Sequence, residues 1–418
     1  MKAERRSVEV WADWTGLPKC SLVGHLHALM PRGKEVFSFE YDEDWLKSGP
    51  KLALDPALAL YSGPQFAAGG DGNFGVFLDS CPDRWGRVLM TRREALRARQ
   101  EGRKARPLFG LDYLLGVHDA QRMGGLRYRV GAGPFLDDDG DVTAPPWTSI
   151  RELEQASLEL ESDDIEASPR YEALLNLLFV PGSSLGGARP KASVLDVDQT
   201  LWLAKFPAKD DLHNTGAWEL VAARLAHKAG VVAAEARAQR FSHPHHTFLT
   251  RRFDRDERGH RIHFASGMAM TGRTDGEGAS YLDLVNVLVQ HGAAPAADLE
   301  QLWRRIVFSM CISNVDDHLR NHGFLLTPAG WVLSPAYDVN PSATGNGHVL
   351  NIDESSNEQD LALAREVAPF FRVKTASAET IIKEVTSAVV TWPTEAAALG
   401  ISRSQQQAMA HAFRLVDR

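Results

Sequence analysis

The sequence predicts an α+β protein whose C-terminal third is mostly helical. In the first half of the chain, short runs in which apolar and polar residues alternate stand between turn residues, as is typical of strands. From about residue 281 onward, Leu, Val, Ile and Ala recur at helical spacing over long stretches. We therefore expect sheets in the N-terminal part and helices in the C-terminal part.

The composition is that of a soluble protein with room for two or three domains. The 418 residues are 44% hydrophobic and 24% charged, and a domain typically takes ~150 residues. The net charge of −8 repels polyanions, which disfavours a nucleic-acid binder that acts alone. Three cysteines offer neither a disulfide framework nor a CxxC spacing, so we expect a cytoplasmic location. We expect no signal peptide and no membrane span, since no apolar run reaches ~18 residues.

Residues 1–147 are predicted to form a small N-terminal α+β domain. Strand-like runs at 7–11 and 35–41 precede a helical stretch after Pro82. Residues 134–147 are rich in Pro, Gly and Asp, as in an exposed linker, and they set the boundary of this domain. The arginine-rich stretch 84–106 fits either a solvated helix face or a basic patch for a partner.

Residues 148–265 and 266–418 are predicted to form two further domains. The first of these should contain a helix at 149–160, a glycine-rich stretch at 182–187, a hairpin of strands at 192–197 and 201–206, and a helix at 216–229. The second should contain helices at 281–291, 296–313, 378–391 and 403–416.

The strongest chemical signal begins at Asp316. Asn321 stands five residues later, two short apolar runs then flank a turn at 327–330, and Asp338 follows. In protein kinases, the Asp of a D-x-x-x-x-N loop accepts the proton of the attacking hydroxyl, the Asn holds Mg²⁺, and an Asp beyond a short hairpin holds the metals at the phosphates. The hairpin returns both metal ligands to one edge, where hard oxygen donors suit Mg²⁺.

Residues suited to phosphate binding precede this motif. The glycine-rich stretch ending at Gly187 can bring backbone N–H groups close to phosphate oxygens. Lys205, near the end of the second strand of the hairpin, stands where a kinase keeps the lysine that reaches the α- and β-phosphates. Glu219, on the following helix, is a candidate partner for Lys205. A Walker A loop is excluded, because no Lys-Ser or Lys-Thr follows Gly187.

Taken singly, each of these elements also has a structural explanation, as a turn, a surface lysine or a solvated helix residue. Their order along the chain is that of a protein kinase, which favours phosphoryl transfer. Two alternatives stay open. One is a metal-dependent phosphohydrolase built on Asp316, Asp317 and His318, and the other is a catalytically silent binding module that keeps the fold.

The chain resembles the HipA family of serine/threonine kinase toxins from bacterial toxin–antitoxin modules, over nearly its whole length. The motifs that carry the resemblance are FSFEY at 37–41 with Trp45-Leu46, LDSCPDRWGR at 78–87, SLGGARPK at 184–191, RFDR at 252–255, DDHLRN at 316–321 and YDV at 337–339. The resemblance implies a protein-kinase-like two-lobed fold, with an extra small N-terminal α+β subdomain and a mostly α-helical C-lobe.

The resemblance also implies roles for single residues. Asp316 looks like the catalytic base, Asn321 and Asp338 like the Mg²⁺ ligands, and Lys205 like the lysine at the ATP phosphates. The further nucleotide-binding residues that the resemblance implies are Ser184, Gly186 and Gly187 in the glycine-rich loop, Arg251 and Phe253 in the hinge at adenine, and His318 and Arg320 beside the base. The hinge position that is usually acidic in the family is Arg251 here.

Ser184 matches the serine that such kinases phosphorylate on themselves, and Ser183 beside it is an alternative acceptor. A phosphate there would add about −1.5 to −2 charges to the loop meant to hold ATP, which predicts self-inactivation. By the same resemblance, the expected function is an ATP- and Mg²⁺-dependent kinase that acts as a toxin by phosphorylating a translation component such as an aminoacyl-tRNA synthetase. The expected partner is a small HipB-like helix-turn-helix antitoxin that binds operator DNA and recruits the kinase as co-repressor.

Overall fold

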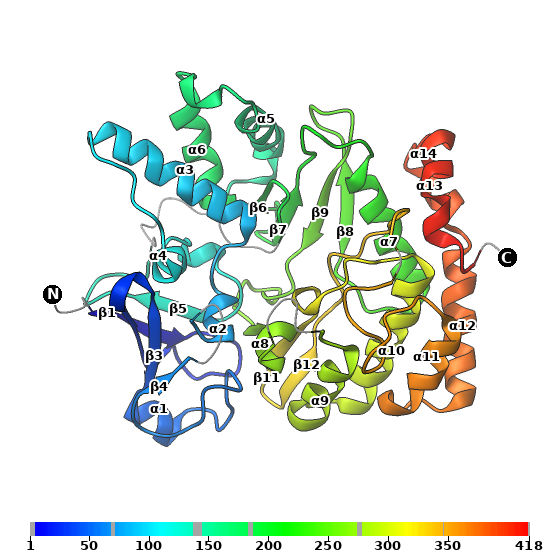
Figure 1. Ribbon diagram of the computed structural model, residues 1–418, viewed down its shortest axis with the longest axis horizontal. Coiled ribbons are helices and arrows are strands. Elements are labelled where there is room, and N and C mark those ends of the chain that lie inside the picture. The colour runs from blue at the N-terminus through cyan, green and yellow to red at the C-terminus, as the bar shows by residue number, and fades with distance from the viewer. Residues whose placement is uncertain are drawn as a thin grey trace. The chain divides into compact units, whose positions relative to one another are not determined.

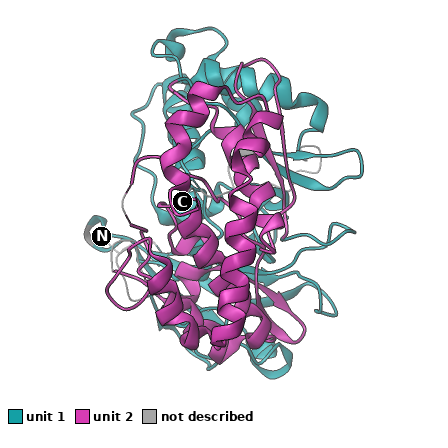
Figure 2. Cartoon of the chain, turned by 90° about the vertical axis from the view of Figure 1, so that its right-hand side faces the viewer, with its two compact units in different colours: residues 1–209, 254–265 teal, residues 210–253, 266–418 magenta. Residues whose placement is uncertain are grey.

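The computed structural model describes residues 5–67, 72–136, 144–182, 187–273, 278–345 and 347–416 (Figure 1). Strands and helices are both abundant, so the prediction of an α+β protein is confirmed. The chain forms two compact units (Figure 2). Residues 1–209 with 254–265 make the first unit, and residues 210–253 with 266–418 make the second. The division into three domains at residues 147 and 265 stays a prediction.

A five-stranded antiparallel sheet opens the first unit, in the order β4-β3-β2-β1-β5. In β1, the buried residues Val8, Val10 and Ala12 alternate with more exposed ones, which gives the strand one apolar face. The predicted strands at 7–11 and 35–41 are confirmed as parts of β1 and β3. The five strands are β1 (Arg5–Ala12), β2 (Ser21–Leu29), β3 (Val36–Tyr41), β4 (Gln65–Phe66) and β5 (Leu126–Arg129).

Helices and a second pair of strands complete the first unit. Helices α3 and α5 pack on α6, and α6 packs on β6. The helices are α1 (Glu43–Ser48), α2 (Gly75–Leu78), α3 (Arg84–Gln100), α4 (Gly110–Leu115), α5 (Ile150–Leu160) and α6 (Tyr171–Gly182), with short 3-10 turns η1 (Pro31–Gly33), η2 (Asp119–Gln121), η3 (Trp147–Ser149) and η4 (Ile165–Ala167). The predicted hairpin is present as β6 (Lys191–Leu195) paired antiparallel with β7 (Leu201–Lys205).

The end of the predicted linker is attached to this hairpin. Leu195 N donates to Pro145 O at 2.9 Å, and Ala144 is buried. The ring of Trp147 meets that of Trp202 edge-on, with centroids 5.6 Å apart. The prediction of an exposed linker is therefore wrong for Ala144, which is buried, and for Trp147, which packs on Trp202. Pro134 and Pro146 are exposed as predicted, and residues 137–143 lie outside the described part of the chain.

Much of the arginine-rich stretch is engaged within the first unit. Arg87 and Arg93 lie over the rings of Tyr113 and Phe179, at 4.7 and 3.8 Å from the ring centroids. Further arginines form the ion pairs Arg99–Glu166, Arg103–Glu94 and Arg106–Asp112. These contacts favour a structural helix face over a patch for a partner.

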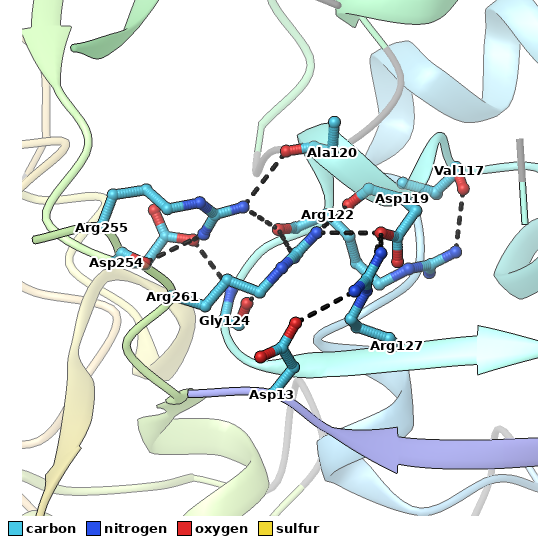
Figure 3. Close-up of polar contacts among 10 residues, drawn as sticks. All are labelled: Asp13, Val117, Asp119, Ala120, Arg122, Gly124, Arg127, Asp254, Arg255 and Arg261. Carbon is cyan, nitrogen blue, oxygen red and sulfur yellow. Dashed lines mark hydrogen bonds and ion pairs between the residues drawn. The ribbon is translucent and has the colours of Figure 1, made fainter. Parts of the chain in front are cut away.

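Residues 254–265 return to the first unit and are held there by a buried network of arginines and aspartates (Figure 3). Arg261 donates to the backbone oxygen of Asp119 at 2.7 Å and to its carboxylate at 3.1 Å. Arg127 donates to the same carboxylate at 2.6 Å. Burial alone would raise the pKa of Asp119, but the charges of Arg261 and Arg127 outweigh it and lower that pKa.

A second set of bonds fixes the start of this returning segment. Asp254 accepts a hydrogen bond from Gly124 N at 2.8 Å. Arg255 donates to the backbone oxygens of Ala120 and Arg122 at 3.2 and 3.0 Å (Figure 3). Since these bonds join residues at least 130 positions apart, the first unit is complete only when the chain has come back to it.

The second unit contains mostly helices, as predicted. Its helices are α7 (Thr215–Lys228), α8 (Gly267–Thr271), α9 (Tyr281–His291), α10 (Pro295–Cys311), α11 (Leu361–Val367), α12 (Thr375–Val389), α13 (Trp392–Ala398) and α14 (Arg403–Met409), with 3-10 turns η5 (Leu319–Asn321), η6 (Ala368–Phe371) and η7 (Ala410–Phe413). Its strands are β8 (Ala236–Gln239), β9 (Thr247–Arg251), β11 (Gly323–Thr327) and β12 (Gly330–Leu333), while β10 (Phe264–Ser266) lies at the boundary between the units.

Two buried helices carry the core of the second unit. Helix α7 begins at Asn214, whose side chain accepts a hydrogen bond from Ala217 N, and it ends before Gly230, which has the positive φ of 72° that glycine favours. Helix α10 buries Leu302, Ile306 and other apolar residues and packs on α9, α11 and α12. Within the described ranges, none of the helices combines the length and apolar character needed to cross a bilayer.

His263 provides a pH-sensitive contribution to the stability of the first unit. It is 1% exposed and stacks on Trp14 with ring centroids 4.7 Å apart, and burial lowers its pKa to about 3. The unfolded chain takes up a proton at this ring below pH ~6.5, whereas the folded chain does not until about pH 3. The stability is therefore present above pH ~6.5 and is lost as the pH falls, by ~1.4 kcal/mol per pH unit.

We expect H263F to flatten the pH dependence of the free energy of unfolding between pH ~6.5 and the acid limit of folding. Urea unfolding at a series of pH values measures this slope. The matched control is H411F, the same substitution at a histidine that is exposed in the folded chain. Equal slopes for H263F and the wild type would contradict the assignment.

Candidate active site

The predicted D-x-x-x-x-N loop lies between α10 and the β11–β12 hairpin. Ser313, with φ of 50°, ends the helix, and Leu319 is buried within the short turn η5. The predicted hairpin is confirmed, with Phe324 opposite Leu333 and Thr327 opposite Gly330.

The loop is fixed by the buried carboxylate of Asp317, which is 3% exposed. The hydroxyl of Tyr281, on α9, donates to Asp317 Oδ2, and that of Ser309, on α10, donates to the same oxygen at 3.2 Å. His322 Nε2 lies 2.8 Å from Asp317 Oδ1. Burial alone would raise the pKa of Asp317, but the charge and hydrogen bond of His322, together with Tyr281, hold it at about 2.

Asp316 is exposed, although its neighbour is buried. Its carboxylate has no hydrogen bond or ion pair to any residue that the structure describes. The contacts of Asp317 fix the backbone of the loop that carries the exposed Asp316. This is the arrangement that a base needs if it is to meet the hydroxyl of another molecule.

Asn321 is tied to the same loop. Its side-chain nitrogen Nδ2 donates to the backbone oxygen of Asp316 at 2.9 Å. The amide nitrogen is therefore committed to the loop, and the amide oxygen Oδ1 is the atom suited to a metal ion. The residue is 8% exposed, which keeps the side chain in this orientation.

Asp338 lies on a segment that is hydrogen-bonded to the loop both before and after Asp338. Before it, the hydroxyl of Tyr337 donates to Arg320 O at 2.6 Å. After it, Asn340 N donates to the side chain of Asn314 at 3.1 Å, and Asn340 Nδ2 donates to Asp338 Oδ1 at 3.3 Å. Asp338 adopts a left-handed backbone with φ of 54°, a conformation that aspartate tolerates better than most residues and that clusters at functional sites.

The other predicted nucleotide-binding residues of the second unit occupy different positions. Phe253 packs its ring on that of Tyr337, with centroids 5.3 Å apart, which brings it to the segment that carries Asp338. The backbone N–H of Arg251 donates a hydrogen bond to Glu235 O at 2.9 Å, so this N–H is not available to adenine. His318 is half-buried, with no hydrogen-bond partner for its Nδ1 among the described residues, and Arg320 is exposed.

Two further predicted residues, Lys205 and Gly187, lie on the first unit. Lys205 is the last residue of β7 and is 8% exposed, and Gly187 has a φ of 107° that only glycine adopts readily. Ser184 and Gly186 lie outside the described residues. Glu219 is buried on α7 of the second unit, and its pairing with Lys205 stays a prediction.

The donors suit Mg²⁺ better than a softer metal. Asn321 and Asp338 supply amide and carboxylate oxygens, the hard ligands that Mg²⁺ prefers. Among the described residues, no group of three His, Cys, Asp or Glu side chains is arranged to hold a metal ion. A hydrolase centre on Asp316, Asp317 and His318 is not supported, because Asp317 is committed to Tyr281 and His322 in the core.

Comparison with known proteins identifies the family. A family model described as the HipA-like C-terminal domain matches residues 183–392, half of the chain. The chain belongs to the HipA family. The matched range contains the Asp316 loop, the β11–β12 hairpin and Asp338, so the HipA family is recognised across the candidate site. A search of curated proteins found no match.

Solved structures give the same result for the fold. The HipA-family chain is similar to a structure titled as the Shewanella oneidensis MR-1 toxin–antitoxin complex of HipA, HipB and operator DNA, with a TM-score of 0.67 and 16% identity over 98% of this chain and 95% of that chain. The predicted kinase-like HipA fold is thereby confirmed. A Helicobacter pylori proinflammatory kinase, CtkA, also matches, with a TM-score of 0.37 and 15% identity over 56% of this chain and 95% of that chain.

Sequence reasoning missed the residues that hold the loop in place. Tyr281 and Ser309 lie 36 and 8 positions before Asp317, and nothing in their sequence context marks them as its donors. The sequence signal that could have indicated such donors is the pair of adjacent aspartates followed by His322. If one carboxylate of the pair is buried, hydrogen-bond donors must surround it.

We expect D317N to lower the free energy of unfolding by about 1–3 kcal/mol, because an asparagine side chain cannot accept all the hydrogen bonds that the buried carboxylate accepts. D316N should change it by less than about 0.5 kcal/mol, because that side chain is exposed and makes no polar contact with the described residues. Urea unfolding of both variants measures the difference. Equal effects of the two substitutions would show that the roles assigned to the two aspartates are wrong.

Proposed function

We propose that this HipA-family chain is an ATP- and Mg²⁺-dependent protein serine/threonine kinase. The observation that carries the proposal is the exposed carboxylate of Asp316 on a loop that the buried Asp317 fixes. Asn321 is bonded to that loop, and the segment of Asp338 is bonded to it on both sides. The same set of contacts therefore holds the proposed base, Asp316, and the two proposed metal ligands, Asn321 and Asp338.

In the proposed reaction, Asp316 acts as the base. The hydroxyl oxygen of a serine or threonine forms a bond to the γ-phosphorus of ATP while the bond from that phosphorus to the ADP oxygen breaks. Asp316 accepts the proton that the hydroxyl loses. An exposed carboxylate without an internal partner suits this role, because it is not committed to holding the fold together.

Asn321 Oδ1 and the carboxylate of Asp338 would hold Mg²⁺, which supplies positive charge at the phosphates when it is bound. The strained backbone of Asp338 and its hydrogen bond from Asn340 fix the direction of its carboxylate. On the first unit, Lys205 would reach the ATP phosphates, and the loop ending at Gly187 would place backbone N–H groups against them. Arg251 would contribute its backbone carbonyl at adenine, since its N–H is already bonded.

The same chemistry applied to Ser184 would inactivate the kinase. A phosphate on this serine would place negative charge where the nucleotide phosphates bind, so the loop and ATP would repel each other. This part of the proposal rests on the position of Ser184 in the glycine-rich sequence.

The proposed biological role is that of a toxin in a toxin–antitoxin module. The similar structure from Shewanella oneidensis contains HipA, HipB and operator DNA, which supports a HipB-like helix-turn-helix antitoxin and operator DNA as partners here. The net charge of −8 fits contact with DNA mainly through the antitoxin. We propose a translation component, such as an aminoacyl-tRNA synthetase, as the protein substrate.

A second candidate function is that of a catalytically silent co-repressor. The complex with HipB and operator DNA in the similar structure favours it, because such a role needs the fold without the reaction. The outward-facing Asp316 and the oxygen donors of Asn321 and Asp338 argue for the kinase, since a silent module has no need for them.

We expect D316N to lower the rate of phosphoryl transfer by about 10²–10⁴-fold, the usual contribution of a general base, with little change in affinity for ATP. Intact-mass spectrometry after incubation with Mg²⁺ and ATP, with peptide mapping of any phosphate, measures this for the wild type and the variant. E354Q is the matched control, because Glu354 is an exposed carboxylate elsewhere in the second unit.

The products separate the candidate functions. Phosphoprotein and ADP from the wild type, reduced in D316N alone, would support the kinase. Free phosphate without phosphoprotein would indicate a hydrolase. A protein with an unmodified glycine-rich loop that neither binds ATP nor gains mass would favour the silent co-repressor.

A further inference from the structure

Two lysines stand directly opposite each other at one end of the β6–β7 hairpin. The register pairs Lys191, the first residue of β6, with Lys205, the last residue of β7. Directly opposed residues of an antiparallel pair project from the same face, and like charges in these positions destabilise the pair. Both lysines are nearly buried, so this arrangement needs a compensating negative charge.

Asp83 supplies a negative charge to Lys191. Its Oδ2 lies 2.6 Å from Lys191 Nζ, and the two side chains are 5% and 2% exposed. The other oxygen, Oδ1, accepts a hydrogen bond from Gly86 N at 2.7 Å and so caps the N-terminus of α3. Asp83 belongs to the sequence motif at 78–87 and has no part in the proposed reaction.

The same end of α3 holds the last residues of the glycine-rich stretch. Trp85 N donates to Gly187 O at 3.4 Å, and a Cβ at Gly187 would lie 3.0 Å from Lys191 Nζ. On the other side, Phe206 N donates to Pro190 O at 2.9 Å. The end of the loop is thus bonded to the start of α3 and to the residue that follows Lys205.

We propose that Asp83 is a positioning residue for the nucleotide site: by pairing with Lys191 it fixes the end of the glycine-rich loop beside Lys205. The inference rests on the proposed function, because it assumes that this loop and Lys205 bind the ATP phosphates. Without the charge of Asp83, the ammonium group of Lys191 loses its ion pair, and the position of Gly187 beside that group is less well fixed.

The test measures the affinity of the full chain for a nonhydrolysable ATP analogue with Mg²⁺, by calorimetry, together with the midpoint of thermal unfolding. D83N keeps a side-chain oxygen that can cap α3 but removes the charge. The matched control is D42N, since Asp42 caps α1 in the same way and its carboxylate forms no salt bridge to a described lysine. We expect D83N to raise the dissociation constant about tenfold, the effect of one charge-assisted hydrogen bond, and D42N to leave it unchanged.

A double variant, D83N with K191M, separates positioning from stability. Removing both charges of a buried pair costs little stability, so its unfolding midpoint should return toward that of the wild type. Its dissociation constant should stay about tenfold raised, because a methionine side chain at this position forms no ion pair that could hold the loop.

Wild-type affinity in D83N, or recovery of both midpoint and affinity in the double variant, would overturn the positioning role and leave the proposed kinase standing. If D83N does not fold, the double variant alone decides. A wild-type chain that does not bind the analogue would instead overturn the proposed function, and this inference with it.

Discussion

The buried carboxylate of Asp317 is the constraint on which the candidate site depends. A charge inside the core is tolerated only when donors surround it, and here α9, α10 and His322, the residue before β11, each contribute one. The backbone of the loop must therefore follow the path that satisfies this carboxylate. The outward direction of Asp316, the bond from Asn321 to the loop and the attachment of Tyr337 all follow from that path.

The first unit solves a similar problem at the β6–β7 hairpin, beside Lys205. Lys191 is as thoroughly buried as Asp317, and Asp83 satisfies its charge while also capping a helix. In both places a charged group without a proposed chemical role is held inside the protein and fixes the position of a neighbour that has one. Such buried pairs contribute little net stability, but they exclude alternative conformations of the loops beside them.

Local patterns in the sequence were sufficient for most elements near the site. Alternation predicted the β6–β7 hairpin, two apolar runs around a turn predicted the β11–β12 hairpin, and helical periodicity predicted α7, α9 and α10, because these signals arise from residues a few positions apart. The sequence could not show which of Asp316 and Asp317 is exposed, since the donors that decide it come from distant helices. It also could not show that Trp147 packs on the hairpin, because its partner Trp202 lies more than 50 positions away.

The return of residues 254–265 to the first unit bears on the order in which the protein is made. A ribosome that has released the first 209 residues has released most of this unit, but not Asp254, Arg255 or Arg261. Until those residues emerge, the acceptors around Asp119 and Ala120 lack their buried partners and must stay hydrated. Folding of the N-terminal unit during synthesis therefore has to wait for more than 40 residues that belong to the second unit.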